Sequence, residues 1–163
     1  KEALKHLQKR IFSHRGLVRL ILVVAIALLF FSQICRPAFI SGGSMLPTYP
    51  EKGFNFCWKP AFWFGNPHRG QVVIARYAGE DVMLLKRVVA LAGDTVEFRA
   101  GQLYVNGVKA HEPYVKSGCN WVLPLRRVDS GCVYLVGDNR GMAMERHKFG
   151  EIAAKRIAGV PLW

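Results

Sequence analysis

The sequence predicts a mainly β protein, in which a domain of antiparallel β-sheet follows one N-terminal transmembrane helix. Three observations support this class. An uncharged apolar run follows a basic segment, short β-branched runs alternate with glycine turns after it, and helical periodicity is weak outside the apolar run. We therefore expect a basic cytoplasmic flank at residues 1–19, a membrane anchor at 20–36 and a β-rich domain at 37–163.

The anchor is predicted from charge. The first nineteen residues carry six basic side chains and one acidic side chain, whereas Leu20 to Cys35 carry no charge. These sixteen residues are slightly short of the roughly 20 that cross a bilayer, and Leu17, Val18 and a snorkelling Arg19 extend them. A buried core helix is the alternative interpretation. Because no A-x-A cleavage site follows, we expect an uncleaved signal anchor. The positive-inside rule then places the N-terminus in the cytoplasm and residues after 36 outside.

Composition limits the class of partner. The chain has 163 residues, of which 51% are hydrophobic, so it can form one domain with a real core. Its formal net charge of +12 favours either nucleic acid or anionic lipid as a neighbour. No zinc-finger spacing, helix-turn-helix signature or RNA-binding motif is evident, so we expect no nucleic-acid partner. A lipid bilayer beside the anchor accounts for the charge.

The strands of the domain are predicted by β-branched runs between turn residues. Ala100-Gly101 and Asn106-Gly107 are typical of tight turns between strands. The expected strands are Gln71–Arg76, Val82–Leu91, Thr95–Arg99, Leu103–Asn106 and Cys132–Val136.

An aromatic segment, FNFCWKPAFWF at residues 54–64, precedes these strands. A core strand followed by a turn at Lys59-Pro60 is one interpretation. Tryptophan and phenylalanine beside lysine also suit a bilayer interface. We expect Phe54 and Phe56 in the core and the segment from Trp58 to Phe64 on lipid.

The four cysteines include no C-x-x-C pair, so we expect neither a zinc site nor a thioredoxin motif. Cys119 and Cys132 bracket a loop, and an oxidising exterior would permit a disulfide between them. Such a bridge would stabilise the fold by roughly 3 kcal/mol in the chain-entropy model. Two unpaired thiols are the alternative.

Lys86 lies inside an apolar strand. In an extended VMLLKRVVA, one face carries Val82, Leu84, Lys86, Val88 and Ala90, and the other carries Met83, Leu85, Arg87 and Val89. Both faces are apolar, so we expect at least one of the two cations to lie on a largely apolar surface. Burial lowers the pKa of a lysine because it disfavours the charged form, whereas arginine stays charged. Lys86 is therefore a candidate neutral base.

Ser44 is a candidate nucleophile for that base. It lies in SGGSMLPT at residues 41–48, directly after the apolar run. A neutral lysine can activate a serine, and only a lowered pKa gives enough neutral amine near pH 7. The alternative for Ser44 is a plain turn at the end of the membrane segment. The alternative for Lys86 is a strand side chain whose amine reaches solvent.

Three ordered motifs give the chain a family resemblance. SGGSMLPT at 41–48, LLKRVVALAGD at 84–94 and GDNRGMAMERHKFG at 137–150 resemble the motifs of type I signal peptidases, and the anchor before them also fits. The resemblance implies a β-rich signal-peptidase-like catalytic domain, with Ser44 as nucleophile and Lys86 as general base. It also implies that the Ser44 backbone N–H binds the oxyanion and that Ile40 and Met45 line a small substrate pocket.

The resemblance further implies the reaction and its place. The enzyme would remove signal peptides from exported preproteins without a metal or cofactor. It would be a single-pass protein of the inner (plasma) membrane, with its catalytic domain on the outer or periplasmic side. Whether a partner subunit is needed stays open.

The chain departs from the family pattern in two motifs. Gly42 stands where many bacterial members have an oxyanion serine. In the third motif Ala143 replaces a serine that orients the lysine, Glu145 replaces an aspartate and His147 replaces an arginine. We expect supporting roles for Gly42, Asp138, Arg140 and Glu145, with Glu145 paired to Arg140 or Arg146, and a surface position for His147.

Two other functions remain open at this point. A catalytically weakened, membrane-anchored binding or scaffold protein on the same fold would explain Ala143. A self-cleaving Ser-Lys repressor would need a DNA-binding domain in place of the apolar run, and none is evident.

Overall fold

The computed structural model describes residues 14–77 and 83–163. The basic side chains of residues 1–13, and Val82 of the predicted strand, lie outside the described residues. The chain divides into two compact units, Lys1–Arg36 and Pro37–Trp163.

The described part of the N-terminal unit is helical from His14 to Ile34. Helix α2 (His14–Leu29) continues into one π-helical turn, η1 (Phe30–Ile34), where the Ser32 hydroxyl donates to the Leu29 carbonyl at 3.0 Å. The helix over His14–Ile34 has 21 residues and a mean hydropathy of 2.5, and none of its apolar span is buried within the protein. It is therefore long and apolar enough to cross a membrane. The exposed apolar surface argues against the alternative of a buried core helix.

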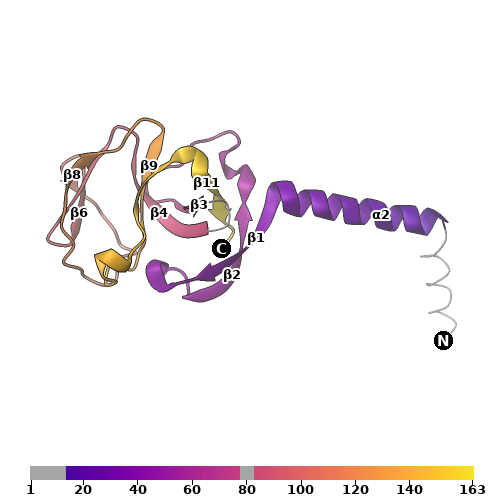
Figure 1. Ribbon diagram of the computed structural model, residues 1–163, viewed down its shortest axis with the longest axis horizontal. Helices are drawn as coiled ribbons and strands as arrows, with labels where there is room; N and C mark the ends of the chain where they lie inside the picture. Colours follow the sequence, from indigo (N-terminus) through magenta and orange to yellow (C-terminus); the bar gives the residue numbers. More distant parts are fainter. Residues whose placement is uncertain (1–13, 78–82) are drawn as a thin grey trace. The chain divides into compact units, whose positions relative to one another are not determined.

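The second unit consists of two antiparallel sheets joined by short turns and 3-10 helices, which confirms the mainly β class (Figure 1). The strands are β1 (Cys35–Ser41), β2 (Lys52–Trp58), β3 (Val72–Arg76), β4 (Met83–Leu91), β5 (Thr95–Arg99), β6 (Gln102–Val105), β7 (Val108–Lys109), β8 (Leu123–Arg127), β9 (Cys132–Val136), β10 (Gly150–Ala153) and β11 (Ile157–Pro161). The 3-10 helices are η2 (Gly43–Met45), η3 (Lys59–Phe62), η4 (Met144–Arg146) and η5 (Ala154–Arg156).

The larger sheet has seven strands in the order β1-β2-β11-β3-β4-β9-β10, and the smaller has four in the order β7-β6-β5-β8. In Figure 1 the smaller sheet, marked by β6 and β8, lies beside β9 and β4 of the larger one. Strand β1 is thus an edge strand, and β4 is central because it pairs with β3 on one side and β9 on the other. The end of β1, which precedes Ser44, and the middle of β4, which carries Lys86, therefore belong to the same sheet.

Strand β4 carries a bulge that divides its buried residues between two cores. Its register against β9 shifts between Val88 and Ala90. Val88 packs in a cluster with Val73 and Leu135, whereas Ala90 belongs to a second cluster around Phe98. The predicted strict alternation, which put Val88 and Ala90 on one face, is therefore wrong beyond the bulge. The alternation holds in the part of β4 before the bulge, where Lys86 lies.

Strand β2 has the opposite phase to the predicted one. Asn55 and Cys57 are buried, whereas Phe54 is exposed and Phe56 is half-buried. The Asn55 side chain is accommodated because its oxygen accepts the Phe56 and Leu162 N–H groups and its amide donates to the Trp163 carbonyl. A buried amide with its hydrogen bonds made costs little, so the polar residue takes the inner face.

Asp94 joins the turn after β4 to the β6–β7 turn. Its carboxylate accepts hydrogen bonds from the Leu91 N–H at 2.7 Å, from Asn106 Nδ2 at 3.0 Å and from Arg69 Nε at 2.8 Å. Burial tends to raise the pKa of Asp94, but these hydrogen bonds to Arg69, Leu91 and Asn106 together lower it below the ordinary value. The charged carboxylate is therefore a structural element of these turns.

Candidate active site

Ser44 lies in helix η2, one turn after the edge strand β1 ends at Ser41. The chain turns at Gly42, whose φ of 108° is a conformation that L side chains rarely adopt, and the Gly42 N–H donates to the Glu51 carbonyl at 2.9 Å. A Cβ at Gly42 would meet no atom within 4 Å. Backbone conformation, and not lack of space, therefore favours glycine over serine at this position.

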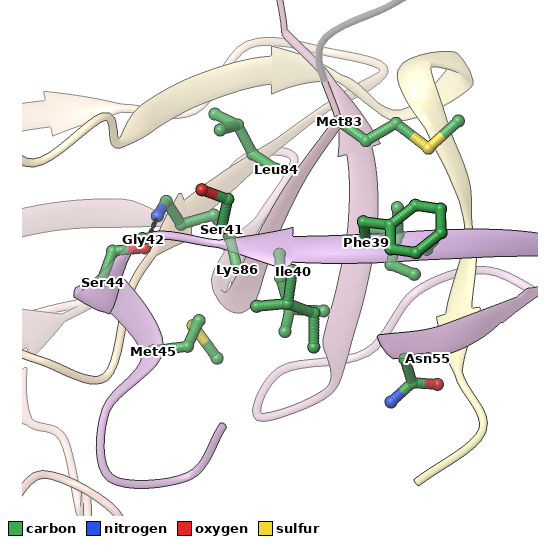
Figure 2. A pocket seen from close by; sticks show the side chains of 13 residues that line it. Phe39, Ile40, Ser41, Gly42, Ser44, Met45, Asn55, Met83, Leu84 and Lys86 are labelled. Atoms are coloured by element: carbon green, nitrogen blue, oxygen red, sulfur yellow. Dashed lines mark hydrogen bonds between the residues drawn. The ribbon is translucent and has the colours of Figure 1, made fainter. Parts of the chain in front are cut away.

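Lys86 projects from the centre of β4 toward Ser44, and its amine donates a hydrogen bond to the Ser44 hydroxyl (Figure 2). The side chain is only 2% exposed. Burial lowers the pKa of Lys86 from 10.5 to about 8; the Asp138 carboxylate opposes this shift and Lys148 adds to it. The burial and the lowered pKa predicted from the strand pattern are both found.

A small cavity of about 50 Å³ opens beside this pair, between β1 and the start of β4. Ile40 and Met45, the two predicted pocket residues, both line it, and Figure 2 shows them on the same side of β1. The sequence reasoning missed its other apolar walls, although Leu84 shares a strand face with Lys86 and follows from the same alternation. These further lining residues include Phe39, Ile74, Met83 and Leu84.

The turn of the third motif holds the segment that carries Ser44. The Asn139 N–H donates to the Ser44 carbonyl at 3.0 Å, and its side-chain amide donates to the Gly43 carbonyl at 2.8 Å. The Gly43 carbonyl belongs to the same planar peptide unit as the Ser44 N–H. Asn139 thereby orients the N–H that is the candidate oxyanion donor. The sequence reasoning missed Asn139, although it lies between the two residues of GDNR that were singled out.

Asp138 and Arg140 support this turn through different partners. Asp138, 1% exposed, accepts a hydrogen bond from Thr48 at 2.6 Å and forms an ion pair with Arg87. Arg140, 2% exposed, donates to the Gly137 carbonyl at 3.0 Å and forms an ion pair with Glu112. The predicted pairing of Arg140 with Glu145 is therefore wrong, because Glu112 occupies that position.

The three residues that depart from the family pattern in the third motif are Glu145, Ala143 and His147. Glu145 is exposed, and within residues 14–77 and 83–163 it forms no ion pair with either Arg140 or Arg146. Ala143 is also exposed, at the N-terminus of η4. The predicted surface position of His147 is wrong, since this side chain is 3% exposed and packs on Trp121. Packing on an aromatic ring distant in sequence decided its burial.

The predicted disulfide between Cys119 and Cys132 is not formed, and both residues are free thiols. Cys119 Sγ donates to the Gly101 carbonyl at 3.3 Å. Cys132 begins β9, and burial together with a hydrogen bond to Glu151 raises the pKa of its thiol. Each sulfur is engaged by a different neighbour. Among the described residues, no group of three His, Cys, Asp or Glu side chains could hold a metal ion.

This geometry provides the parts of an acyl-transfer site. A serine hydroxyl is hydrogen-bonded to a buried amine whose lowered pKa makes it a usable base. The peptide unit that carries the serine N–H is held by the Asn139 side chain, which donates to its carbonyl.

Comparison with known proteins gives one consistent family. The model of the family "Signal peptidase, peptidase S26" matches residues 14–162. Signal peptidase I of Bacillus licheniformis is 32% identical over 151 residues, covering 86% of this chain and 81% of the relative. Signal peptidase I S of Bacillus subtilis (strain 168) is 33% identical over 153 residues, covering 86% and 82%. A crystal structure of a signal peptidase I from Enterococcus faecalis is similar with a TM-score of 0.48 and 25% identity, over 59% of this chain and 97% of that one.

Proposed function

Because the chain belongs to the signal peptidase family, peptidase S26, we propose that Ser44 and Lys86 are the residues with which it cleaves signal peptides. Signal-peptide removal is the activity that the family and the signal peptidase I relatives support for this chain. The observation that carries the residue assignment is the hydrogen bond between the buried Lys86 amine and the Ser44 hydroxyl.

Lys86 acts as the general base. With a pKa of about 8, roughly a tenth of the molecules hold a neutral amine at pH 7, far more than for an exposed lysine. In that form the Ser44 hydroxyl donates its proton to the amine lone pair while Oγ attacks the scissile carbonyl. The attack forms a C–O bond and moves the carbonyl electron pair onto oxygen.

The remaining steps use the same groups. The Ser44 N–H, held through Asn139, stabilises the oxyanion. The Lys86 ammonium returns its proton to the leaving amine as the C–N bond breaks, which leaves an ester on Ser44. A water molecule then attacks this acyl-enzyme with Lys86 again as base, and the Ser44 hydroxyl is restored.

The substrate is an extended peptide with small side chains near the cleaved bond. Strand β1 is the edge of the seven-stranded sheet and leads directly to Ser44, so a peptide can pair with its open edge. The cavity of about 50 Å³ beside Ile40 and Met45 suits a side chain of the size of alanine. This size agrees with the small residues that precede signal-peptide cleavage sites.

The helix over His14–Ile34 anchors the enzyme in a membrane, which is proposed to be the inner (plasma) membrane. Arg15 and Arg19 favour a cytoplasmic N-terminus by the positive-inside rule, which puts the β-rich unit on the outer or periplasmic side. Exposed aromatic side chains of that unit, with Trp63 56% and Phe64 99% exposed, suit contact with lipid headgroups. No nucleic-acid partner is proposed.

A weakened scaffold protein is the less favoured function. Its main support was Ala143, but this residue is exposed, and the hydrogen-bonded Ser44–Lys86 pair is intact.

The test is cleavage of a model preprotein by the detergent-solubilised full chain, followed by N-terminal sequencing of the product. Ser44→Ala and Lys86→Ala should each abolish turnover, and the double variant should lose little more because the two groups act as a unit. Equal residual cleavage by all three variants and the wild type would reject the assignment.

A further inference from the structure

His147 is a buried histidine that the proposed mechanism does not use. Its side chain is 3% exposed and follows η4, where its N–H donates to the Met144 carbonyl at 3.1 Å. The imidazole packs edge-on against Trp121, with 4.8 Å between ring centroids, and lies 5.9 Å from the Phe149 ring. Aromatic contacts fix the ring from one side, and its other side is turned toward the third-motif turn.

The imidazole and the Ser44 carbonyl approach the same point of Gly137. A Cβ on this glycine would lie 2.2 Å from the Ser44 oxygen, 2.5 Å from His147 Cε1 and 2.7 Å from His147 Nε2. All three distances are shorter than real Cβ contacts, so only glycine lets these two groups come so close. The Cε1–Nε2 edge of the ring therefore lies beside the nucleophile's backbone.

The ring nitrogens have unused hydrogen-bonding capacity. Both are buried, and neither makes a hydrogen bond of ordinary geometry with the part of the chain that the structure describes. Buried polar atoms without a partner are costly and uncommon in native proteins. The Ser44 oxygen accepts one hydrogen bond, from Asn139, and a carbonyl oxygen can accept a second.

The surroundings keep the ring neutral. Burial, and then the positive charges of Lys86 and Arg140, lower the pKa of His147 from 6.5 to about 4, while the backbone of Ser44 and Asn139 opposes the shift. A neutral imidazole carries one N–H and one acceptor nitrogen. It therefore adds a donor beside the nucleophile without adding charge next to Lys86.

We propose that neutral His147 is a positioning residue for the nucleophile, whose Nε2–H donates to the Ser44 carbonyl and fixes Ser44 as substrate binds. This inference rests on the proposed function of Ser44 and Lys86. Hydrogen bonds of a catalytic site are often long in the free enzyme and shorten in the substrate complex. Asn139 holds both peptide units around the Ser44 Cα, through its side-chain amide and its N–H, and His147 adds a second donor to the carbonyl after it. Together they fix the direction of the Ser44 side chain toward Lys86.

Three substitutions separate this role from packing. His147→Phe keeps an aromatic ring on Trp121 but removes both nitrogens. His147→Gln puts an amide N–H near the position of Nε2, whereas the shorter His147→Asn reaches only the position of Nδ1. Val128→Ala is the matched control, because Val128 belongs to the same buried cluster as Trp121 but is not one of the aromatic side chains that hold the His147 ring.

Each full-length variant is assayed in detergent with a model preprotein, at a temperature well below its melting point. His147→Phe should lower kcat about five- to tenfold with KM nearly unchanged, since one hydrogen bond of ordinary strength is lost in the transition state. His147→Gln should recover most of this loss, and His147→Asn should resemble His147→Phe. Val128→Ala should lower the melting temperature without lowering kcat.

Wild-type kcat in all three His147 variants, or a loss of kcat in Val128→Ala that follows its melting temperature in the same way, would overturn the inference. Turnover in Ser44→Ala or Lys86→Ala would instead overturn the proposed function, so the two failures are distinct. If His147→Phe does not fold, nitrogen-15 NMR of the wild-type imidazole decides. A neutral ring protonated on Nε2 at pH 7 is expected, and protonation on Nδ1 would exclude the donor role.

Discussion

The Asp138 carboxylate and the Arg87 guanidinium meet in two parallel hydrogen bonds, from Nε to Oδ1 at 2.9 Å and from Nη2 to Oδ2 at 2.6 Å. Arg87 follows Lys86 on β4 and points to the other face, where it also donates to the Gly70 carbonyl and lies over the Tyr114 ring at 3.8 Å. The charge of Asp138 raises the pKa of Lys86 against the effect of burial. One ion pair thus supports the turn and influences the base.

Asp138→Asn should move the pH–rate midpoint to lower pH, because the pKa of Lys86 loses the carboxylate that raises it. Removing one member of a buried pair should also lower the free energy of unfolding by about 3–5 kcal/mol. Asp94→Asn is the control, since Asp94 is paired with Arg69 in a different turn. It should reduce stability without moving the midpoint. A midpoint that shifts equally in both variants would show that the effect is not specific to Lys86.

The rate of cleavage should rise with pH with a midpoint near 8, the pKa of Lys86. The value to measure is kcat/KM between pH 6 and 10, because it reports ionisation of the free enzyme. His147, with a pKa of about 4, should add no inflection in that range. A profile that climbs only near pH 10.5 would mean that Lys86 behaves as an exposed lysine.

Lys86→Met should be inactive but more stable than the wild type at pH 7. The folded pKa of about 8 lies below the ordinary 10.5, so the folded state binds its proton more weakly than the unfolded state. The wild type therefore gains stability as pH rises from about 8 to 10.5, by about 3 kcal/mol. Thermal unfolding of both proteins at pH 7 and pH 10.5 should show the advantage of the variant shrinking. An advantage that is equal at both pH values would contradict the buried charge.

Ala143→Ser should leave kcat/KM within about twofold, because exposed surface substitutions rarely have larger effects. Ala143 is exposed and precedes η4, which has no side-chain cap. A serine hydroxyl there should cap the helix and raise stability by about 0.5–1 kcal/mol. Both values come from steady-state kinetics and thermal unfolding of the same preparation. A fivefold rise in rate would show that the hydroxyl reaches Lys86 after all.

Much of the fold followed from local pattern. The bounds of Cys132–Val136 were predicted as they are found, because the run is β-branched and is followed by Gly-Asp. The alternation in β4 predicted that at least one of its two cations lies on an apolar surface, and Lys86 is the buried one. Patterns of this kind depend on residues that are close in sequence, and they were sufficient for the central strands.

Other features depended on partners far along the chain. Alternation in β2 separates its two faces but does not say which face points inward. The face with Asn55 points inward because Leu162 and Trp163 form hydrogen bonds with its side-chain amide. The burial of His147 depends in the same way on Trp121. The ion pair between Arg140 and Glu112 was not predicted, because Glu112 lies outside the three motifs. Sequence motifs located the reacting groups, and tertiary contacts decided how they are supported.

The hydrogen bond from Asn139 to the Gly43 carbonyl has a consequence for folding order. It joins residues 96 positions apart, so the turn that carries Ser44 can be fixed only after the chain through Asn139 has been synthesised and docked. Contacts of such long range form slowly, because a large loop must close before they contribute. A newly made chain would therefore lack a fixed Ser44 turn while its own segments and neighbouring polypeptides are still unfolded and open to cleavage. Proteolytic competence would be acquired only once the fold around Ser44 is complete.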